Sequence, residues 1–228
     1  MQRYDLVFID ADETLFDFAR AELVALDEAL GKLGVVVDGR VFETYVAINS
    51  RAWREVEAGT LDRDSLKTRR FAELFAALGI EGDATITGES YLDSLSMQGW
   101  LIEGAQEICA FLRERAKLIL LTNGITRVQR GRLARSAIRD DFDQVVISEE
   151  VGFAKPDPRV FALAAGLEGL TDRSRMVVVG DSLSSDIAGG VAYGIDTCWY
   201  NPRGLDPGEW QPTWTVASLG DLRGLFLG

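Results

Sequence analysis

The chain has 228 residues, of which 47% are hydrophobic, and a formal net charge of -12. This hydrophobic fraction excludes a disordered chain, and the length suits one large domain or a domain with a substantial insertion. The acidic balance argues against nucleic acid or an acidic membrane surface as a partner, while a small phosphorylated metabolite remains compatible with it. The sequence contains no histidine, which excludes imidazole-based catalytic triads and histidine-ligated zinc.

The cysteines and the apolar stretches indicate the compartment. Cys109 and Cys198 are far apart in the sequence and in no metal-like spacing, so we expect two buried thiols in a reducing environment and no disulfide framework. A membrane span needs about 18 consecutive apolar residues, and no run in the sequence approaches this length. The N-terminal residues lack the pattern of a signal peptide. We therefore expect a cytoplasmic protein without a membrane partner.

Five short apolar runs predict buried strands. They are rich in β-branched residues and are apolar throughout instead of alternating, which is typical of a parallel sheet covered on both faces. Helical stretches accompany them at 102–116, 126–138, 157–169 and 184–193. This order predicts an α/β fold, a doubly wound, Rossmann-like parallel sheet. The predicted strands are residues 4–10, 117–123, 144–148, 176–181 and 196–200.

Residues 17–98 interrupt the alternation, because they contain no strand-like run. A first helix is predicted from four leucines on one face, and Gly34 follows it. Two more helical stretches, 39–59 and 64–79, close on glycine. We interpret 17–98 as an inserted helical cap and residues 1–16 with 99–228 as the catalytic core. The four leucines are Leu23, Leu26, Leu30 and Leu33.

Acidic side chains follow the predicted strands. Asp10 and Asp12 end the first strand, Asp181 ends the fourth, and Asp186 follows shortly after it. Parallel sheets bind ligands at the carboxyl ends of their strands, so we expect these acids to meet. Such a cluster is unfavourable without a cation, and Mg²⁺ accepts carboxylates while bridging to phosphate. Lys155, after the third strand, provides a second positive charge.

This cluster predicts phosphoryl chemistry. A carboxylate beside Mg²⁺ can attack phosphorus and form an aspartyl-phosphate, while a second carboxylate two residues on transfers protons. The Thr122 hydroxyl and the backbone amides that follow it can hold phosphoryl oxygens. Asn123, next to Gly124, either lines this phosphate pocket or caps the following helix, and the sequence does not separate the two.

Four segments in this order resemble the four motifs of the haloacid dehalogenase superfamily of phosphohydrolases: "DADET", "LLTNG", "AKPDP" and "GDSLSSD". The resemblance covers the whole chain and implies that residues 17–98 are a cap of the family's first type. It makes Asp10 the nucleophile and a metal ligand. It makes Asp12 the general acid/base, with its backbone carbonyl on the metal. Thr122 and Lys155 then bind the phosphate, Asp181 binds the metal, and Asp186 supports it, often through water.

The segments "DADETLF", "TNGIT", "VISEEVG" and "TCWYN" are similar to the bacterial pyrimidine 5′-nucleotidase branch. Glu13 stands where the superfamily's commonest first motif has glycine. The branch implies a small nucleotide such as UMP, dUMP or dTMP as substrate. In the cap, Trp53 is a candidate to stack on a base and Arg70 to bind a polar group. Trp53 is also compatible with packing in the core, and Arg70 with a solvated face or an internal salt bridge.

Three alternatives accompany the nucleotidase hypothesis. A phosphatase for sugar phosphates or other small metabolites would use the same site. A haloacid dehalogenase would use the same nucleophile on carbon, but it needs neither a proton donor nor the second pair of acids. A receiver-type phosphoacceptor protein would carry its phosphorylated aspartate on a middle strand and would be much shorter. The acid pair on the first strand and the long insertion both argue against this last alternative.

Overall fold

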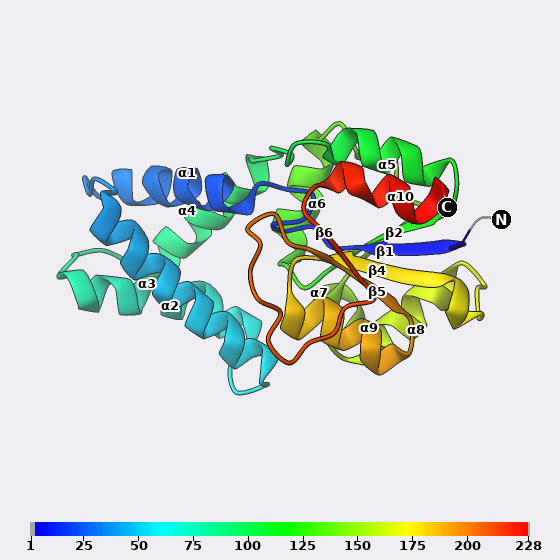
Figure 1. Cartoon of the computed structure of the whole chain (residues 1–228). Helices are drawn as coiled ribbons and strands as arrows, with labels where there is room; N and C mark the ends of the chain where they lie inside the picture. The colour runs from blue at the N-terminus through cyan, green and yellow to red at the C-terminus, as the bar shows by residue number, and fades with distance from the viewer. Residues whose placement is uncertain (1–2, 228) are drawn as a thin grey trace. The chain divides into compact units, whose positions relative to one another are not determined.

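A computed structural model describes residues 3–227 of the chain (Figure 1). The chain divides into two compact units. The first, which we call the sheet unit, runs up to Phe18 and resumes at Gly99; the second, the helical unit, is Ala19–Gln98. Every strand of the described residues belongs to the sheet unit, and the helical unit contains helices and their connections.

The sheet unit is built on one six-stranded sheet with the order β3-β2-β1-β4-β5-β6. All neighbouring strands are parallel. The chain moves outward from β1 through β2 to β3 and then returns to β4 on the other side of β1, so the switch point lies between β1 and β4. The predicted doubly wound sheet is confirmed. The strands are β1 (Leu6–Ile9), β2 (Lys117–Thr122), β3 (Gln144–Ile147), β4 (Met176–Gly180), β5 (Asp196–Tyr200) and β6 (Trp214–Val216).

The apolar strands are buried on both faces, as their continuous hydrophobic runs predict. Val7 and Ile9 of β1 point into one core, while Leu6 and Phe8 point into the other. The first core contains side chains of α5 (Ala105–Arg113) and α10 (Gly224–Leu227), and the second those of α8 (Pro158–Leu167) and α9 (Ala188–Tyr193). Figure 1 shows these two layers on opposite faces of the sheet. Full burial of a valine, leucine, isoleucine or phenylalanine side chain in these cores stabilises the fold by about 1.5–3 kcal/mol.

The helical unit consists of α1 (Phe18–Gly31, whose first residue lies in the sheet unit), α2 (Gly39–Glu57), α3 (Arg63–Leu78) and α4 (Ala84–Met97). Aspartates cap three of these helices: Asp38, Asp62 and Asp83 each accept a hydrogen bond from a backbone N–H of the first turn. Gly79 ends α3 in the left-handed conformation with φ 67°, as a closing glycine predicts. Helix α4 is an addition, because the sequence predicted only three helices here.

The core of the helical unit differs from the predicted leucine stripe. Leu26 and Leu30 are buried, but Leu23 is 42% exposed and Leu33 is 37% exposed. The stripe was therefore wrong at two of its four positions. The reason is that the buried side of α1 is filled by three alanines in addition to the two leucines, and a search for large apolar residues overlooks alanines. The buried apolar residues of α1 are Ala21, Ala25, Leu26, Ala29 and Leu30.

Other predictions from composition can be compared with the structure. Cys109 and Cys198 are both buried and free, which confirms the prediction of two buried thiols. None of the helices within residues 3–227 has the length and apolar character needed to cross a membrane.

Strand β6 follows the turn-rich residues 201–212. The sequence did not predict this strand, because three residues are too short to show a strand pattern.

Candidate active site

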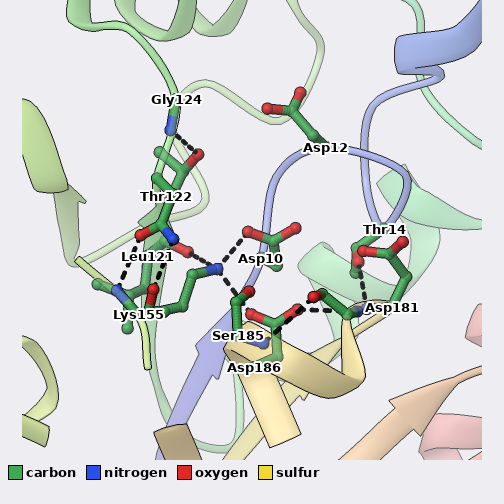
Figure 2. A network of polar contacts seen from close by, with 12 residues as sticks. Asp10, Asp12, Thr14, Leu121, Thr122, Gly124, Lys155, Asp181, Ser185 and Asp186 are labelled. Carbon is green, nitrogen blue, oxygen red and sulfur yellow. Dashed lines mark hydrogen bonds and ion pairs between the residues drawn. The ribbon is translucent and has the colours of Figure 1, made fainter. Parts of the chain in front are cut away.

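Three carboxylates meet at the carboxyl ends of β1 and β4 (Figure 2). Asp10 follows β1, and its backbone N–H donates to the carbonyl of Val179 in β4 at 2.9 Å. Asp181 follows β4, and Asp186 lies in the π-helical turn Leu183–Ile187. One carboxylate oxygen from each of Asp10, Asp181 and Asp186 lies within 4.8 Å of the other two. The sheet therefore brings together the acids that follow its two central strands.

Lys155 lies among these acids and is 2% exposed. Its Nζ donates to Asp10 Oδ1, to Asp186 Oδ1 at 2.7 Å and to the carbonyl oxygen of Leu121 at 2.7 Å. Burial lowers the pKa of Lys155, but the negative charges of Asp10 and Asp186 outweigh this effect and raise the pKa above its ordinary value. Lys155 is therefore a fixed cation inside the acidic cluster.

One lysine does not neutralise three carboxylates. Burial, followed by the charges of Asp10 and Asp186, raises the pKa of Asp181 to about 8. Burial also raises the pKa of Asp186 to about 6, although the positive charge of Lys155 acts in the opposite direction. Both shifts mean that the cluster holds more negative charge than its surroundings stabilise. A set of carboxylate oxygens with excess negative charge fits a hard divalent cation such as Mg²⁺.

Hydrogen bonds to the main chain hold Asp181 and Lys155 in place. The backbone N–H of Asp181 donates to Thr14 Oγ1 at 3.1 Å, and Trp199 Nε1 donates to the carbonyl of Asp181 at 2.8 Å. Asn123 Oδ1 accepts from the N–H of Lys155 at 2.9 Å, and its Nδ2 donates to the Lys155 carbonyl at 2.8 Å. The capping role considered for Asn123 is wrong, because the residue that caps α6 (Thr126–Arg135) is Ile125. The Asn123 amide holds the main chain of Lys155, and its place in a phosphate pocket stays a prediction.

The last residue of β2 places a hydroxyl beside a glycine of the loop that follows. Thr122 is 1% exposed, and its Oγ1 accepts a hydrogen bond from the N–H of Gly124 at 3.1 Å. A Cβ at Gly124 would lie 2.0 Å from Gln129 Nε2, and one at Gly180 would lie 2.2 Å from Asp186 Cγ. Both glycines are therefore required by the close approach of a side chain to the backbone.

The expectation that all four acids meet is wrong for Asp12, whose side chain takes a different direction from that of Asp10, as Figure 2 shows. The Asp12 side chain accepts hydrogen bonds from Gln129 Nε2 at 2.7 Å and from Arg132 Nη2. Sequence reasoning missed both partners. The available signal was helical spacing, because Gln129 and Arg132 lie with Val128 and Leu133 on the buried side of α6. An arginine or glutamine on such a face needs a polar partner.

The two candidate residues of the helical unit have different surroundings. Trp53 is half-buried on α2. Arg70 is 2% exposed; its Nη1 donates to Asn49 Oδ1 at 3.0 Å, and its guanidinium lies 4.6 Å from the ring centroid of Tyr91. The prediction of a solvated face for Arg70 is therefore wrong. Arg70 is packed inside the unit, against a neutral amide and an aromatic ring instead of the carboxylate of a salt bridge. Contact of either residue with substrate stays a prediction.

Comparison with known proteins identifies the class. Residues 4–194 match the family model of the haloacid dehalogenase-like hydrolases. The chain is 36% identical to pyrimidine 5′-nucleotidase YjjG of Escherichia coli, over 98% of each chain. It is 37% identical to pyrimidine 5′-nucleotidase PynA of Streptococcus pneumoniae, over 96% of this chain and 93% of PynA. The crystal structure of magnesium-bound YfnB from Bacillus subtilis superposes with a TM-score of 0.92 at 31% identity, covering 98% of this chain and 99% of YfnB.

A doubly wound sheet with an acidic cluster at its switch point, together with these matches, defines the class of protein. The chain belongs to the haloacid dehalogenase-like hydrolase family. The predictions of the family, of the fold class and of a phosphoric monoester hydrolase are confirmed.

Proposed function

We propose that the protein is a Mg²⁺-dependent phosphatase that hydrolyses pyrimidine nucleoside 5′-monophosphates through an aspartyl-phosphate on Asp10. The observation that carries this proposal is the position of Asp10, which follows the central strand β1 within 4.8 Å of two further carboxylates and in contact with Lys155. The negative charge of a nucleophilic carboxylate must be balanced before a phosphate dianion can approach it. Lys155, and a cation at the three carboxylates, would balance the charge of Asp10.

The proposed reaction has two steps. In the first, a carboxylate oxygen of Asp10 attacks phosphorus, the bond from phosphorus to the ester oxygen breaks, and Asp12 gives its proton to that oxygen. In the second, water attacks phosphorus while Asp12 takes a proton from it. The acyl phosphate bond breaks, which releases inorganic phosphate and restores the Asp10 carboxylate.

The remaining residues position charge. Lys155, together with the Thr122 hydroxyl and the backbone N–H groups at Asn123 and Gly124, would hold the phosphoryl oxygens. The side chains of Asp10 and Asp181 and the backbone carbonyl of Asp12 would hold Mg²⁺, with Asp186 supporting the site. When bound, Mg²⁺ supplies a positive charge that neutralises the phosphoryl group.

The choice of substrate rests on the relatives. Two proteins described as pyrimidine 5′-nucleotidases align with nearly the whole chain, at 36% and 37% identity. The alignments cover 98% and 96% of this chain. They therefore include residues 19–98, the unit in which a cap would recognise the base. This extent favours a nucleotide over a sugar phosphate, which is the second candidate of the same class.

A substrate panel tests the proposal. The purified enzyme is assayed with Mg²⁺ against UMP, dUMP, dTMP, CMP, AMP, GMP and several sugar phosphates, and phosphate release is measured with and without EDTA. We expect the highest kcat/KM with the uridine and thymidine monophosphates, and loss of activity in EDTA that Mg²⁺ restores. Preference for a sugar phosphate would replace the substrate assignment. Full activity in EDTA would contradict the metal assignment, and halide release from a haloacid would favour dehalogenase chemistry.

A further inference from the structure

A buried arginine contacts the proposed acid–base residue. Arg132 on α6 is 0% exposed. Its Nη2 donates to Asp12 Oδ1 and, at 3.1 Å, to Gln129 Oε1. Gln129 Nε2 in turn donates to Asp12 Oδ2 at 2.7 Å. Each oxygen of the Asp12 carboxylate therefore accepts one hydrogen bond, and the two donors are also bonded to each other.

The burial of Arg132 is costly for the fold. Nε and Nη1 of its guanidinium have no hydrogen-bond partner in the part of the chain that the structure describes, and burial lowers the pKa of the group to about 9. The guanidinium carbon lies 4.7 Å from the Phe16 ring centroid and 5.7 Å from that of Phe18. Such cation–π contacts offset only part of the cost of removing the guanidinium from water. An apolar residue would fill this space at lower cost, so packing does not account for an arginine here.

The backbone near the site is adapted to the second donor. A Cβ at Gly124 would lie 2.0, 2.8 and 2.9 Å from three side-chain atoms of Gln129. The absence of a side chain at Gly124 thus lets the Gln129 amide lie against the loop that follows Thr122 and reach Asp12. Asp12 is accordingly held from two directions, by a neutral amide and by a guanidinium, and it points away from Asp10 and Lys155 (Figure 2).

We infer that Arg132 and Gln129 are positioning residues that orient the Asp12 carboxyl group for proton transfer to the leaving oxygen. The inference rests on the proposed function, because it assigns a partner to the proposed acid–base residue. A proton donor must lie within hydrogen-bond reach of the atom that it protonates, so a carboxyl group free to rotate would lose part of its effect.

This role makes a prediction about leaving groups. p-Nitrophenolate departs without a proton, whereas phenolate and the alkoxide of a nucleotide depart readily only when they are protonated. The quantity kcat/KM reports the steps up to loss of the leaving group. Loss of Asp12 orientation must therefore lower kcat/KM for phenyl phosphate far more than for p-nitrophenyl phosphate. A purely structural defect would lower both by the same factor.

The experiment compares Arg132→Lys, Arg132→Met and Gln129→Leu with the parent enzyme on both aryl phosphates with Mg²⁺. Arg130→Met is the matched control, because Arg130 is an exposed residue of the same helix and pairs with Glu150. General acid catalysis contributes about 10²–10⁴-fold. We expect Arg132→Met to lower kcat/KM for phenyl phosphate by about 10²-fold and for p-nitrophenyl phosphate by less than about 10-fold. Arg132→Lys, which keeps the charge, should recover part of the difference, and Arg130→Met should match the parent on both substrates.

A double-mutant cycle completes the test. In an Asp12→Asn background, Arg132→Lys should cause no further loss on phenyl phosphate, since the residue acts through Asp12. Equal losses on both substrates, or losses that add fully to those of Asp12→Asn, would overturn the inference while leaving the proposed function intact. If Arg132→Met does not fold, Gln129→Leu and Arg132→Lys decide by the same ratio. A parent enzyme that hydrolyses no phosphomonoester would instead refute the proposed function and this inference with it.

Discussion

The two units of the chain bury arginines in different surroundings. In the sheet unit, Arg132 contacts a carboxylate, Asp12, at the edge of the sheet where Asp10 and Lys155 also lie. In the helical unit, Arg70 contacts the neutral amide of Asn49 and the ring of Tyr91. In the sheet unit, the guanidinium contacts a group of opposite charge. In the helical unit, the guanidinium contacts a neutral amide and the face of an aromatic ring.

The difference lies in where the partners come from. The polar groups of the sheet unit follow separate strands and converge because parallel strands end at one edge. Those of the helical unit come from facing helices and lie among aromatic rings: Tyr45, Phe71 and Tyr91 are 5.4–5.5 Å apart, centroid to centroid. We therefore expect the same chemical change to affect activity in the sheet unit and stability in the helical unit.

The largest expected effect comes from Asp10→Asn. Loss of the nucleophile should lower kcat by about 10⁴-fold or more, because an amide oxygen does not form the acyl phosphate. The matched control is Asp62→Asn in the helical unit, since asparagine caps a helix as well as aspartate does. The control should keep full activity and the parent melting temperature. Measured kcat values test the pair, and substantial turnover by Asp10→Asn would remove Asp10 from the proposed mechanism.

The next effect is on stability in the helical unit. Phe71 is 0% exposed and packs against Tyr45 and Tyr91, so Phe71→Ala should cost about 3–5 kcal/mol. Because residues 19–98 form a compact unit, hydrogen exchange should accelerate in that unit and stay unchanged in the strands. Exchange measured by mass spectrometry tests this. Equal acceleration in both units would mean that they unfold as one cooperative body.

The part of the site that could be predicted from the sequence lies mainly at the ends of strands. Asp10 and Asp181 could be identified because each directly follows a continuous apolar run, and parallel strands bring such positions together. Strands within residues 4–10, 117–123 and 176–181 were predicted for the same reason. Lys155 comes later, after β3 and the short helix α7 (Ser148–Val151), and was identified from its place after the third strand and before Pro156. The roles of Asp10, Asp181 and Lys155 as nucleophile, metal ligand and phosphate ligand stay predictions.

The features that were not predicted depend on tertiary packing. The partners of Asp12 come from α6, and only the rotation of that helix against the sheet turns Gln129 and Arg132 inward. Likewise, Leu23 lies outside the buried side of α1, although its spacing from Leu26 and Leu30 fits a helical stripe. Periodicity gives the positions that share a helix face, but it does not give which of several possible faces the fold covers.

Magnesium should stabilise the sheet unit in a pH-dependent way. The pKa values of Asp181, about 8, and Asp186, about 6, are raised above the ordinary value of 3.8. Their contribution to the stability of the metal-free protein is therefore fully present below about pH 4 and is lost as pH rises through 6 to 8. A cation needs both groups deprotonated, so the metal-bound form avoids this loss.

The measurement is the melting temperature with and without Mg²⁺ at pH 6 and pH 8. Mg²⁺ at 100 times its Kd adds about 2.7 kcal/mol, and we expect the gain at pH 8 to exceed that at pH 6. In Asp181→Asn the gain should shrink at both pH values, whereas Asp62→Asn should behave as the parent does. An equal gain at both pH values in the parent protein would show that these carboxylates do not bind the ion.

The smallest expected effect concerns two residues with left-handed backbone conformation, one in each unit. Glu13 has φ 58° and Gly79 has φ 67°, and no atom lies within 4 Å of a Cβ built at Gly79. A non-glycine residue in this conformation costs about 1–2 kcal/mol, and glycine loses about 0.5–1 kcal/mol in chain entropy. Glu13→Gly should therefore raise the free energy of unfolding by about 0.5 kcal/mol, while Gly79→Ala should lower it by about 1 kcal/mol. Urea denaturation measures both, and a loss in Glu13→Gly would mean that contacts of the Glu13 side chain outweigh its backbone strain.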